Sequence, residues 1–349
     1  KNNLAFEGIN VMGGPLIQAE INLGAIAHNT RELHGLLKPG TRLMSVVKAN
    51  GYGHGSVEVA ETALRCGATS LGVARLEEAI VLRVSGISSP ILVFGHVPDE
   101  NLSDLMNYDL TGTIYSLQSA ERMSRAAVGQ GGTIRAHVKI DTGMGRLGLL
   151  DDSLKSKENL RKEHASIHDD MAVIARLPGL VLEGVYTHFA SADSLDKTYA
   201  NHQFHLFEEL LENLKQEGIE FPLQHCANSA GIIDLPETHL DMVRAGISTY
   251  GLYPSSEVQV NRVQLKPAMT LKSRIIQLKD VPEGFKVSYG STYQAPHPTT
   301  VATVPVGYAD GYFRLLSGCG QMLVRGQKAT VAGRVCMDQS ILDVGHIPD

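Results

Sequence analysis

The sequence predicts an α/β protein: a (β/α)8 TIM barrel followed by a mostly β C-terminal domain. Short aliphatic or β-branched runs recur eight times between residues 43 and 248, and amphipathic helical stretches separate most of them. After Tyr253 the helical periodicity fades, and strand-like runs joined by tight turns follow. We therefore expect the barrel over residues 15–253 and the β domain over residues 254–349.

The expected barrel strands are rich in Val, Ile, Leu and Ala, as is typical of parallel strands buried under helices. They lie at residues 43–49, 70–74, 90–95, 110–116, 135–141, 180–190, 223–229 and 241–248. Residues 56–66 and 199–218 repeat apolar side chains at helical spacing, which predicts helices packed on the sheet. The pattern also fits a doubly wound open sheet, and strand counting does not decide between the two. The charged stretch 151–170 is interpreted as a solvated helix and loop.

Six further runs predict the strands of the second domain. They lie at residues 269–278, 286–288, 299–306, 321–324, 329–335 and 339–344. Turn residues such as Gly284 and Gly326 stand between them. The lead-in at residues 9–14 is expected either to add a strand to this domain or to form a tail.

The composition excludes several classes of protein. A chain of 349 residues suits about two domains. The net charge of −6 argues against nucleic acid or an anionic membrane as the main partner. No apolar run approaches the roughly 18 residues that span a bilayer, and four scattered cysteines without CxxC spacing favour reduced thiols. We expect a cytoplasmic protein with no dedicated metal site.

Lys48 stands at the end of the first expected strand, where the active sites of barrels lie. An ammonium group is costly to bury at an apolar strand end. Desolvation lowers the pKa of such a lysine and makes it a nucleophile, suited to a Schiff base with an aldehyde cofactor. The alternative is a surface lysine whose aliphatic stem lies along the strand.

The last two expected strands end in residues suited to a phosphate group. Ser229 offers a hydroxyl group, and Gly246 allows close approach of the backbone. Each residue alone is more often part of an ordinary turn. A buried amine at Lys48 together with a phosphate cradle is a more specific combination, and it describes pyridoxal phosphate.

Eight motifs, in this order, resemble those of the alanine racemase family. The most specific is Val46-Val47-Lys48-Ala49-Asn50-Gly51-Tyr52-Gly53-His54-Gly55, and the others lie at residues 139–148, 187–190, 227–230, 243–247, 287–290, 307–312 and 334–339. The resemblance extends from about Ile21 to the end of the chain. It implies a pyridoxal-phosphate-dependent racemase that interconverts L- and D-alanine and supplies D-alanine for peptidoglycan.

The resemblance also implies a two-base mechanism in a homodimer whose active site is shared between subunits. Lys48 is the base on one face of the substrate, and Tyr289 from the partner subunit is the base on the other. His188 and Arg244 are expected in the neighbourhood of Tyr289, where positive or donor groups help a phenol act as a base. From the residues alone, Tyr289 is more simply an aromatic packing residue in a β strand.

The remaining roles follow from the same resemblance. Arg244 faces the pyridine nitrogen of the cofactor and keeps it unprotonated, because arginine does not give up its proton; the alternative is a structural arginine paired with Asp241 or Asp234. The other cofactor-binding positions are Tyr52, Arg146, His188, Asn228, Ser229, Gly246 and Ile247, with Tyr52, Ser229, Gly246 and Ile247 on the phosphate.

The substrate positions implied are Arg146, the backbone of Met337 across the dimer, and Tyr308 as a gate on the entry path. Tyr308 is otherwise a turn-packing residue beside Gly307. Lys139 occupies the position that carries a carbamate in many relatives, where it orients Arg146.

Three other functions compete with alanine racemisation. A racemase of the same fold acting on serine or a broad range of amino acids has the same motifs. A non-catalytic pyridoxal-phosphate carrier lacks a β domain, so Tyr289 and Met337 argue against it. A pyridoxal-dependent decarboxylase places a glutamate near the pyridine nitrogen, which Arg244 contradicts. The family continues past the equivalent of Asp349 with a tyrosine for the cofactor phosphate, so we expect either that the chain is truncated there or that its grip on the phosphate is weaker than in the family.

Overall fold

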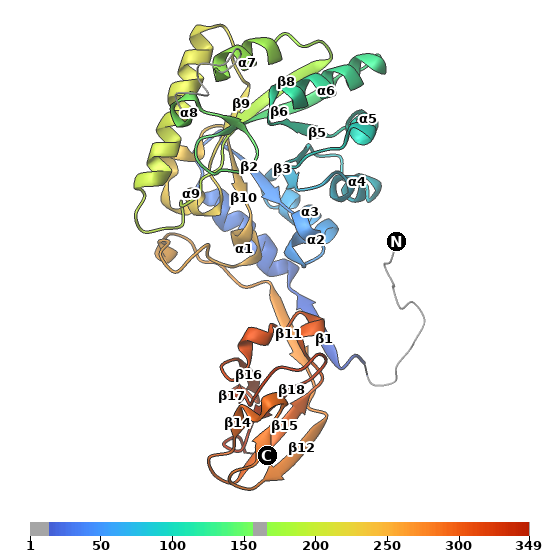
Figure 1. The fold of residues 1–349 in the computed structure, drawn as a ribbon, viewed down its shortest axis with the longest axis vertical. Coiled ribbons are helices and arrows are strands. Elements are labelled where there is room, and N and C mark those ends of the chain that lie inside the picture. Colours follow the sequence, from blue (N-terminus) through green and yellow to red (C-terminus); the bar gives the residue numbers. More distant parts are fainter. Residues whose placement is uncertain (1–13, 156–165, 349) are drawn as a thin grey trace. The chain divides into compact units, whose positions relative to one another are not determined.

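The computed structural model describes residues 14–155 and 166–348 and divides into two compact units (Figure 1). The barrel unit comprises residues 21–268, and the β unit comprises residues 14–20 and 269–348. The segment 254–268, expected in the β domain, belongs to the barrel unit, because its backbone is bonded there: Asn29 Nδ2 donates to the carbonyl of Lys266 at 2.8 Å. Of the lead-in at 9–14, all but Gly14 lies outside the described residues, as do residues 156–165.

Every expected barrel strand is found, and the strands form one nearly closed parallel sheet. They are β2 (Arg42–Val46), β3 (Ala68–Val73), β4 (Ile91–Val93), β5 (Thr111–Ile114), β6 (Ile134–Asp141), β8 (Leu180–Tyr186), β9 (Leu223–His225) and β10 (Met242–Ala245), with the short β7 (Leu149–Leu150) beside β6. β10 pairs with β2, and the chain at β10 is bonded to that at β9: the Asp241 N–H, just before β10, donates to the Gln224 carbonyl at 3.2 Å, and the Arg244 N–H donates to the carbonyl of Ala227, just after β9, at 3.0 Å. The doubly wound open sheet is thereby excluded.

Helices surround this sheet (Figure 1). They are α1 (Leu23–Gly35), α2 (Lys48–Tyr52), α3 (Ser56–Arg65), α4 (Leu76–Val84), α5 (Leu102–Asn107), α6 (Leu117–Gly129), α7 (Ile167–Ile174), α8 (Thr198–Gln216) and α9 (Ser229–Asp234). α8 shows why they pack there, since Phe207, Leu210 and Leu214 recur every three or four residues and are almost fully buried. α1 is capped by Asn22, the residue before it, whose side chain accepts a hydrogen bond from the N–H of Ala25 at 3.0 Å.

α2 is not a right-handed helix but a left-handed turn directly after β2. Ala49, Asn50, Gly51 and Tyr52 have φ values of 53°, 52°, 61° and 52°. Left-handed backbone costs roughly 1–2 kcal/mol per non-glycine residue. Such a turn therefore persists only where its surroundings hold it in place.

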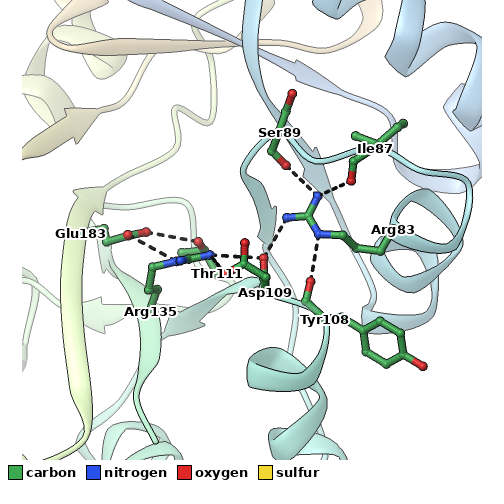
Figure 2. Close-up of polar contacts among 8 residues, drawn as sticks. All are labelled: Arg83, Ile87, Ser89, Tyr108, Asp109, Thr111, Arg135 and Glu183. Atoms are coloured by element: carbon green, nitrogen blue, oxygen red, sulfur yellow. Dashed lines mark hydrogen bonds and ion pairs between the residues drawn. The ribbon is translucent and has the colours of Figure 1, made fainter.

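The amino ends of the strands are joined by two arginines (Figure 2). Arg83 donates to four backbone carbonyls in the segments that lead into β4 and β5, at 2.7 to 2.9 Å, which belong to Ile87, Ser89, Tyr108 and Asp109. Arg135 in β6 pairs with Glu183 of β8 at 3.4 Å, and Thr111 of β5 donates to the same carboxylate. This cluster lies at the opposite end of the strands from their carboxyl termini.

The β unit is built on a five-stranded antiparallel sheet. Its order is β12 (Gln277–Val281), β15 (Thr299–Val304), β18 (Ser340–Asp343), β17 (Gln327–Val331) and β16 (Gln321–Val324), and two small sheets pair β1 (Ile17–Ile21) with β11 (Met269–Ser273) and β13 (Lys286–Val287) with β14 (Tyr293–Gln294). The single strand expected at 269–278 is wrong. The chain passes there from one sheet to another. The Arg274 N–H donates to the carbonyl of Leu16 on the β1 side, and the Ile276 N–H donates to the carbonyl of Thr303 in β15.

The described ranges, 14–155 and 166–348, hold neither a helix that could cross a membrane nor a cluster of side chains that could bind a metal ion. No helix within them has the length and apolar character needed to cross a membrane. No three or more His, Cys, Asp or Glu side chains in these ranges gather so that they could hold a metal ion.

Candidate functional site

A pocket of about 510 Å³ opens at the carboxyl ends of the barrel strands. It is lined by every barrel residue that the sequence singled out: Lys48, Tyr52, Lys139, Arg146, His188, Asn228, Ser229, Arg244, Gly246 and Ile247. Tyr289, Tyr308 and Met337 are in the β unit and are not among the residues that line it. Four of the lining side chains are basic, against the carboxylate of Asp193, so the pocket favours an anionic ligand.

Lys48 contributes an amine to this pocket from the first turn after β2. Burial, followed by the positive charge of Arg146, lowers the pKa of this amine, and the carboxylate of Glu78 opposes the shift. The Lys48 Nζ lies 6.0 Å from the centre of the Tyr52 ring. A lysine with a depressed pKa has a larger neutral fraction near pH 7 and is a better nucleophile and base.

Tyr52, Ser229 and Gly246 meet on one side of the pocket. The Ser229 hydroxyl accepts a hydrogen bond from the N–H of Gly246 at 2.9 Å. A Cβ atom built on Gly246 would lie only 3.0 Å from the Tyr52 hydroxyl and 3.7 Å from Ser229 Oγ, so glycine keeps this space open. Tyr52 itself is packed on Tyr250, with ring centres 4.6 Å apart. The result is a cradle of two hydroxyl groups on a close-packed backbone, suited to a small anion.

Arg244 is buried in the wall of the barrel, and its hydrogen bonds to the described residues include no carboxylate. Its guanidinium donates to the carbonyls of Thr187, His225 and Cys226 at 2.8 to 3.2 Å, and to the Nδ1 atoms of His225 and His188 at 2.8 and 3.1 Å. Burial lowers the pKa of Arg244 to about 10, so the group still carries its proton at neutral pH.

The alternative pairing of Arg244 with Asp241 or Asp234 is not found in the structure. The Asp234 carboxylate is buried against Lys197 Nζ at 2.7 Å. The Asp241 carboxylate accepts a hydrogen bond from the N–H of Gln224 at 2.8 Å. Both aspartates therefore serve other contacts.

The Arg244 contacts fix the protonation of three histidines. A guanidinium can only donate, so the Nδ1 atoms of His225 and His188 must accept and their protons lie on Nε2. The Nε2 of His225 then donates to Nδ1 of His137 at 2.9 Å. Burial, together with the charge of Arg244, holds the pKa of His188 and of His225 well below the usual range and lowers that of His137 to about 4. All three imidazoles are consequently neutral at physiological pH.

Lys139 lies in β6 with its amine deep in the pocket. Only 6% of the residue is exposed, and Nζ has no hydrogen-bond partner within residues 14–155 and 166–348. It stands 5.2 Å from the centre of the Tyr186 ring. Burial and then the charge of Arg244 lower the pKa of Lys139 to about 8. A buried, unpartnered amine is unusual and marks a group available for chemistry or modification.

Arg146 is presented by a loop that Asp141 holds in shape. The Asp141 carboxylate accepts hydrogen bonds from the N–H groups of Gly143, Met144 and Gly145 at 2.8 to 3.1 Å. Because three successive amides converge on one side chain, the loop has a defined path and Arg146 is carried to the pocket rim.

Tyr289, Tyr308 and Met337 gather around one segment of the β unit. The N–H of Tyr308 donates to the carbonyl of Cys336 at 3.1 Å, and Ser288, next to Tyr289, donates through its hydroxyl to the carbonyl of Arg334 at 2.6 Å. The three predicted residues remain exposed, at 69% for Tyr289, 44% for Tyr308 and 60% for Met337.

Sequence reasoning missed several residues of the pocket and its supports. Tyr186, Phe94 and Asp193 line the pocket, and His137 and His225 support Arg244 from behind. The alternation of side chains along β6 gives a weak signal for His137, because His137 is two residues from Lys139 and therefore lies on the same face of the strand. Their partners come from other strands, which no local pattern reveals.

Comparison with known proteins agrees with this geometry. Residues 21–254 match the model of the alanine racemase N-terminal domain, and residues 268–349 match that of the alanine racemase C-terminal domain. A curated alanine racemase of Desulfosudis oleivorans is 52% identical over 331 residues, which cover 95% of this chain and 84% of the relative.

Solved structures give the same result for the fold. The alanine racemase of Clostridium difficile 630 has a TM-score of 0.87 at 38% identity, and the match covers 98% of this chain and 85% of that one. A complex of that enzyme with cycloserine has a TM-score of 0.85 at 37% identity, covering 96% and 84% of the two chains. The fold and the motifs along both units agree with these relatives, and this chain belongs to the alanine racemase family of isomerases.

Proposed function

We propose that this enzyme interconverts L- and D-alanine with pyridoxal phosphate bound to Lys48. The observation that carries the proposal is that the depressed-pKa amine of Lys48 and the anion cradle of Tyr52, Ser229 and Gly246 line one strongly basic pocket. Its relatives are named as alanine racemases, and one of them binds cycloserine. Serine or broad-range racemisation remains the alternative to be tested.

The residues present are suited to pyridoxal phosphate. Tyr52, Ser229, Gly246 and Ile247 would hold the phosphate, with Asn228 capping the turn that carries Ser229, since its side chain accepts from the N–H of Gly231 at 3.0 Å. Arg244 would face the ring nitrogen as a donor, and Arg146 the phenolic oxygen. When bound, the cofactor withdraws electrons from the α-carbon of an amino acid and weakens its C–H bond.

Racemisation then requires one group that removes the α-proton and another that returns a proton to the opposite face. We assign the first role to Lys48 Nζ and the second to the phenol of Tyr289. The neutral His188 offers its Nε2–H as a donor in the pocket, in keeping with its Nδ1 contact to Arg244. Arg146 and the backbone of Met337 would orient the substrate carboxylate, and Tyr308 would narrow the entry to small side chains.

We further propose that Tyr289, Tyr308 and Met337 act on the pocket of a second copy, in a homodimer with shared sites. Their exposure supports this, because the Tyr289 side chain is 69% exposed and therefore gains little packing energy within its own β unit. We also assign the enzyme to the cytoplasm and its D-alanine product to peptidoglycan. Growth of a D-alanine auxotroph supplied with this chain tests the last point.

The amine of Lys139 is proposed as a carbamate. Carbamylation would replace a buried cation with an anion next to Arg244 and Arg146, whose charges already depress the pKa of Lys139. The new oxygen atoms would accept hydrogen bonds where the amine has no partner. Such a group would orient Arg146.

Two measurements test the function. Incubation with pyridoxal phosphate, borohydride reduction and mass spectrometry should find the label on Lys48; a label on another lysine, or none, contradicts the cofactor assignment. Racemisation of alanine, serine, lysine and arginine should then show the highest kcat/KM for alanine. A higher value for serine or a basic amino acid would replace the substrate and leave the cofactor assignment standing.

A further inference from the structure

Glu78 uses its two carboxylate oxygens for different purposes. It is the third residue of α4, and its Oε2 accepts hydrogen bonds from the N–H groups of Ala74 and Arg75 at 2.8 and 3.1 Å, which caps that helix. Its Oε1 accepts a hydrogen bond from the N–H of Ala49 at 2.6 Å, across the gap between α4 and α2. Capping therefore occupies one oxygen and leaves the other directed at the residue after Lys48.

The hydrogen bond between the Ala49 N–H and Glu78 acts on the backbone next to Lys48. This N–H belongs to the peptide plane that joins Lys48 to Ala49, so fixing it restricts ψ of Lys48 and φ of Ala49. Ala49 begins the left-handed turn, with φ of 53° and ψ of 49°, a conformation that a residue with a Cβ rarely adopts. Within the turn, the Asn50 side chain accepts a hydrogen bond from the N–H of Ser56 at 3.0 Å, which ties the turn to the start of α3. Two side-chain contacts, those of Glu78 and Asn50, thus hold the turn.

We propose that Glu78 is a positioning residue for Lys48, holding the Lys48–Ala49 peptide in place so that the amine stays directed into the pocket. The inference rests on the function proposed for Lys48 and adds a residue that lies outside every motif singled out in the sequence. The charge of Glu78 partly offsets the lowering of the Lys48 pKa by burial and by Arg146, so the proposed role rests on the hydrogen bond to the Ala49 N–H.

The chain offers a matched control for the capping role alone. Ser119 is the third residue of α6, and its hydroxyl accepts hydrogen bonds from the N–H groups of Tyr115 and Ser116, both at 3.0 Å. These are the same two positions that Glu78 caps in α4. Ser119→Ala therefore removes an equivalent cap without touching the turn after Lys48.

The test compares Glu78→Gln, Glu78→Asp and Ser119→Ala. Glutamine keeps the length of the side chain but has one acceptor oxygen, and aspartate keeps the charge but is one methylene shorter. In cofactor-free protein, deuterium exchange of the peptide covering residues 47–53 should become faster in both Glu78 variants and stay unchanged in Ser119→Ala. Capture of pyridoxal phosphate by Lys48 should slow about tenfold, as should kcat, with KM changed less than about twofold.

Each outcome supports or overturns the proposed role of Glu78. Wild-type exchange and wild-type capture in both Glu78 variants would overturn the proposal. So would equal slowing in Ser119→Ala at a matched loss of Tm, because a general loss of stability would then explain the effect. If the wild-type protein neither captures the cofactor nor racemises alanine, the proposed function fails, while the exchange comparison still decides whether Glu78 holds this turn.

Discussion

Arg244 keeps a permanent charge inside the barrel wall by donating only to carbonyl oxygens and imidazole nitrogens. This arrangement determines the state of its neighbours. His225 and His188 must accept at Nδ1, and the proton on Nε2 of His225 in turn makes His137 an acceptor. The Arg244 guanidinium thus fixes the tautomers of His188, His225 and His137.

His137 should make the protein sensitive to acid. Burial and the charge of Arg244 lower the pKa of His137 to about 4, below the value near 6.5 in an unfolded chain. The unfolded state therefore binds this proton first, so the stability is intact above about pH 6.5 and is lost as the pH falls towards 4. In His137→Gln, which can still accept from His225, the loss of unfolding free energy over this range should be smaller by about 3 kcal/mol. Denaturant titrations at several pH values measure it, and parallel curves would contradict it.

Lys139 should respond to carbon dioxide. With a pKa of about 8, a large fraction of the amine is neutral in mild alkali, and only the neutral amine adds to CO2, releasing a proton as the carbamate forms. We expect 13C-bicarbonate to give a carbamate resonance that is missing in Lys139→Met. Depletion of CO2 should reduce wild-type activity reversibly and leave that of Lys139→Met unchanged. Identical responses of the two proteins would exclude the modification.

At the scale of elements, the two ends of the strands have different tasks. The carboxyl ends of β2, β6, β8, β9 and β10 carry the pocket residues, while the amino ends are tied together by Arg83 and Arg135 (Figure 2). Arg83 donates to four backbone carbonyls in the segments just before β4 and β5. Stability and function are therefore separated along the strands, as is common in barrels.

Arg83→Leu should lower the free energy of unfolding by roughly 2–4 kcal/mol, because it leaves several carbonyls without a donor. Catalysis at a temperature well below Tm should be within about twofold of wild type, since the pocket is at the other end of the strands. Arg83→Lys, which keeps the charge but offers fewer directed donors, should fall between the two. A large fall in kcat at full folding would show that the two ends are coupled.

At the scale of the whole molecule, we interpret the exposed apolar side chains of the β unit as an interface for a partner. Phe313 and Leu315 are 72% and 90% exposed and lie in the same unit as Tyr289, Tyr308 and Met337. Apolar side chains that gather at a surface commonly mark an interface. We propose a second copy of this chain as that partner, with its Tyr289 at a pocket lined by barrel residues.

Mixing two inactive variants tests the shared site. Lys48→Ala and Tyr289→Phe should each be inactive alone or strongly impaired. In a statistical mixture half of the dimers are mixed, and one of the two sites in each is intact, so about a quarter of wild-type activity should return. Native mass spectrometry should verify that subunits have exchanged. No recovery after verified exchange would mean that the whole site belongs to one chain.

Much of the fold and of the pocket could be predicted, because both leave local signals. Apolar runs alternating with amphipathic stretches report buried strands and covering helices, and polar residues at strand ends report a site. The long run at 269–278 misled this reasoning, since a continuous strand pattern does not reveal that β11 and β12 join different sheets. Glu78 left no signal either, because a helix-capping glutamate is ordinary in isolation.

The sequence by itself determined the eight barrel strands and ten of the residues that line the pocket, since these depend on local periodicity and on motifs of a few residues. The tertiary structure decided what those residues touch. The contact of His137 with His225 joins positions 88 residues apart, and that of Glu78 with Ala49 joins positions 29 apart. Such pairs exist only once the strands are in register and the barrel has closed, so the tautomers, the supports of Arg244 and the hold on Lys48 are properties of the fold.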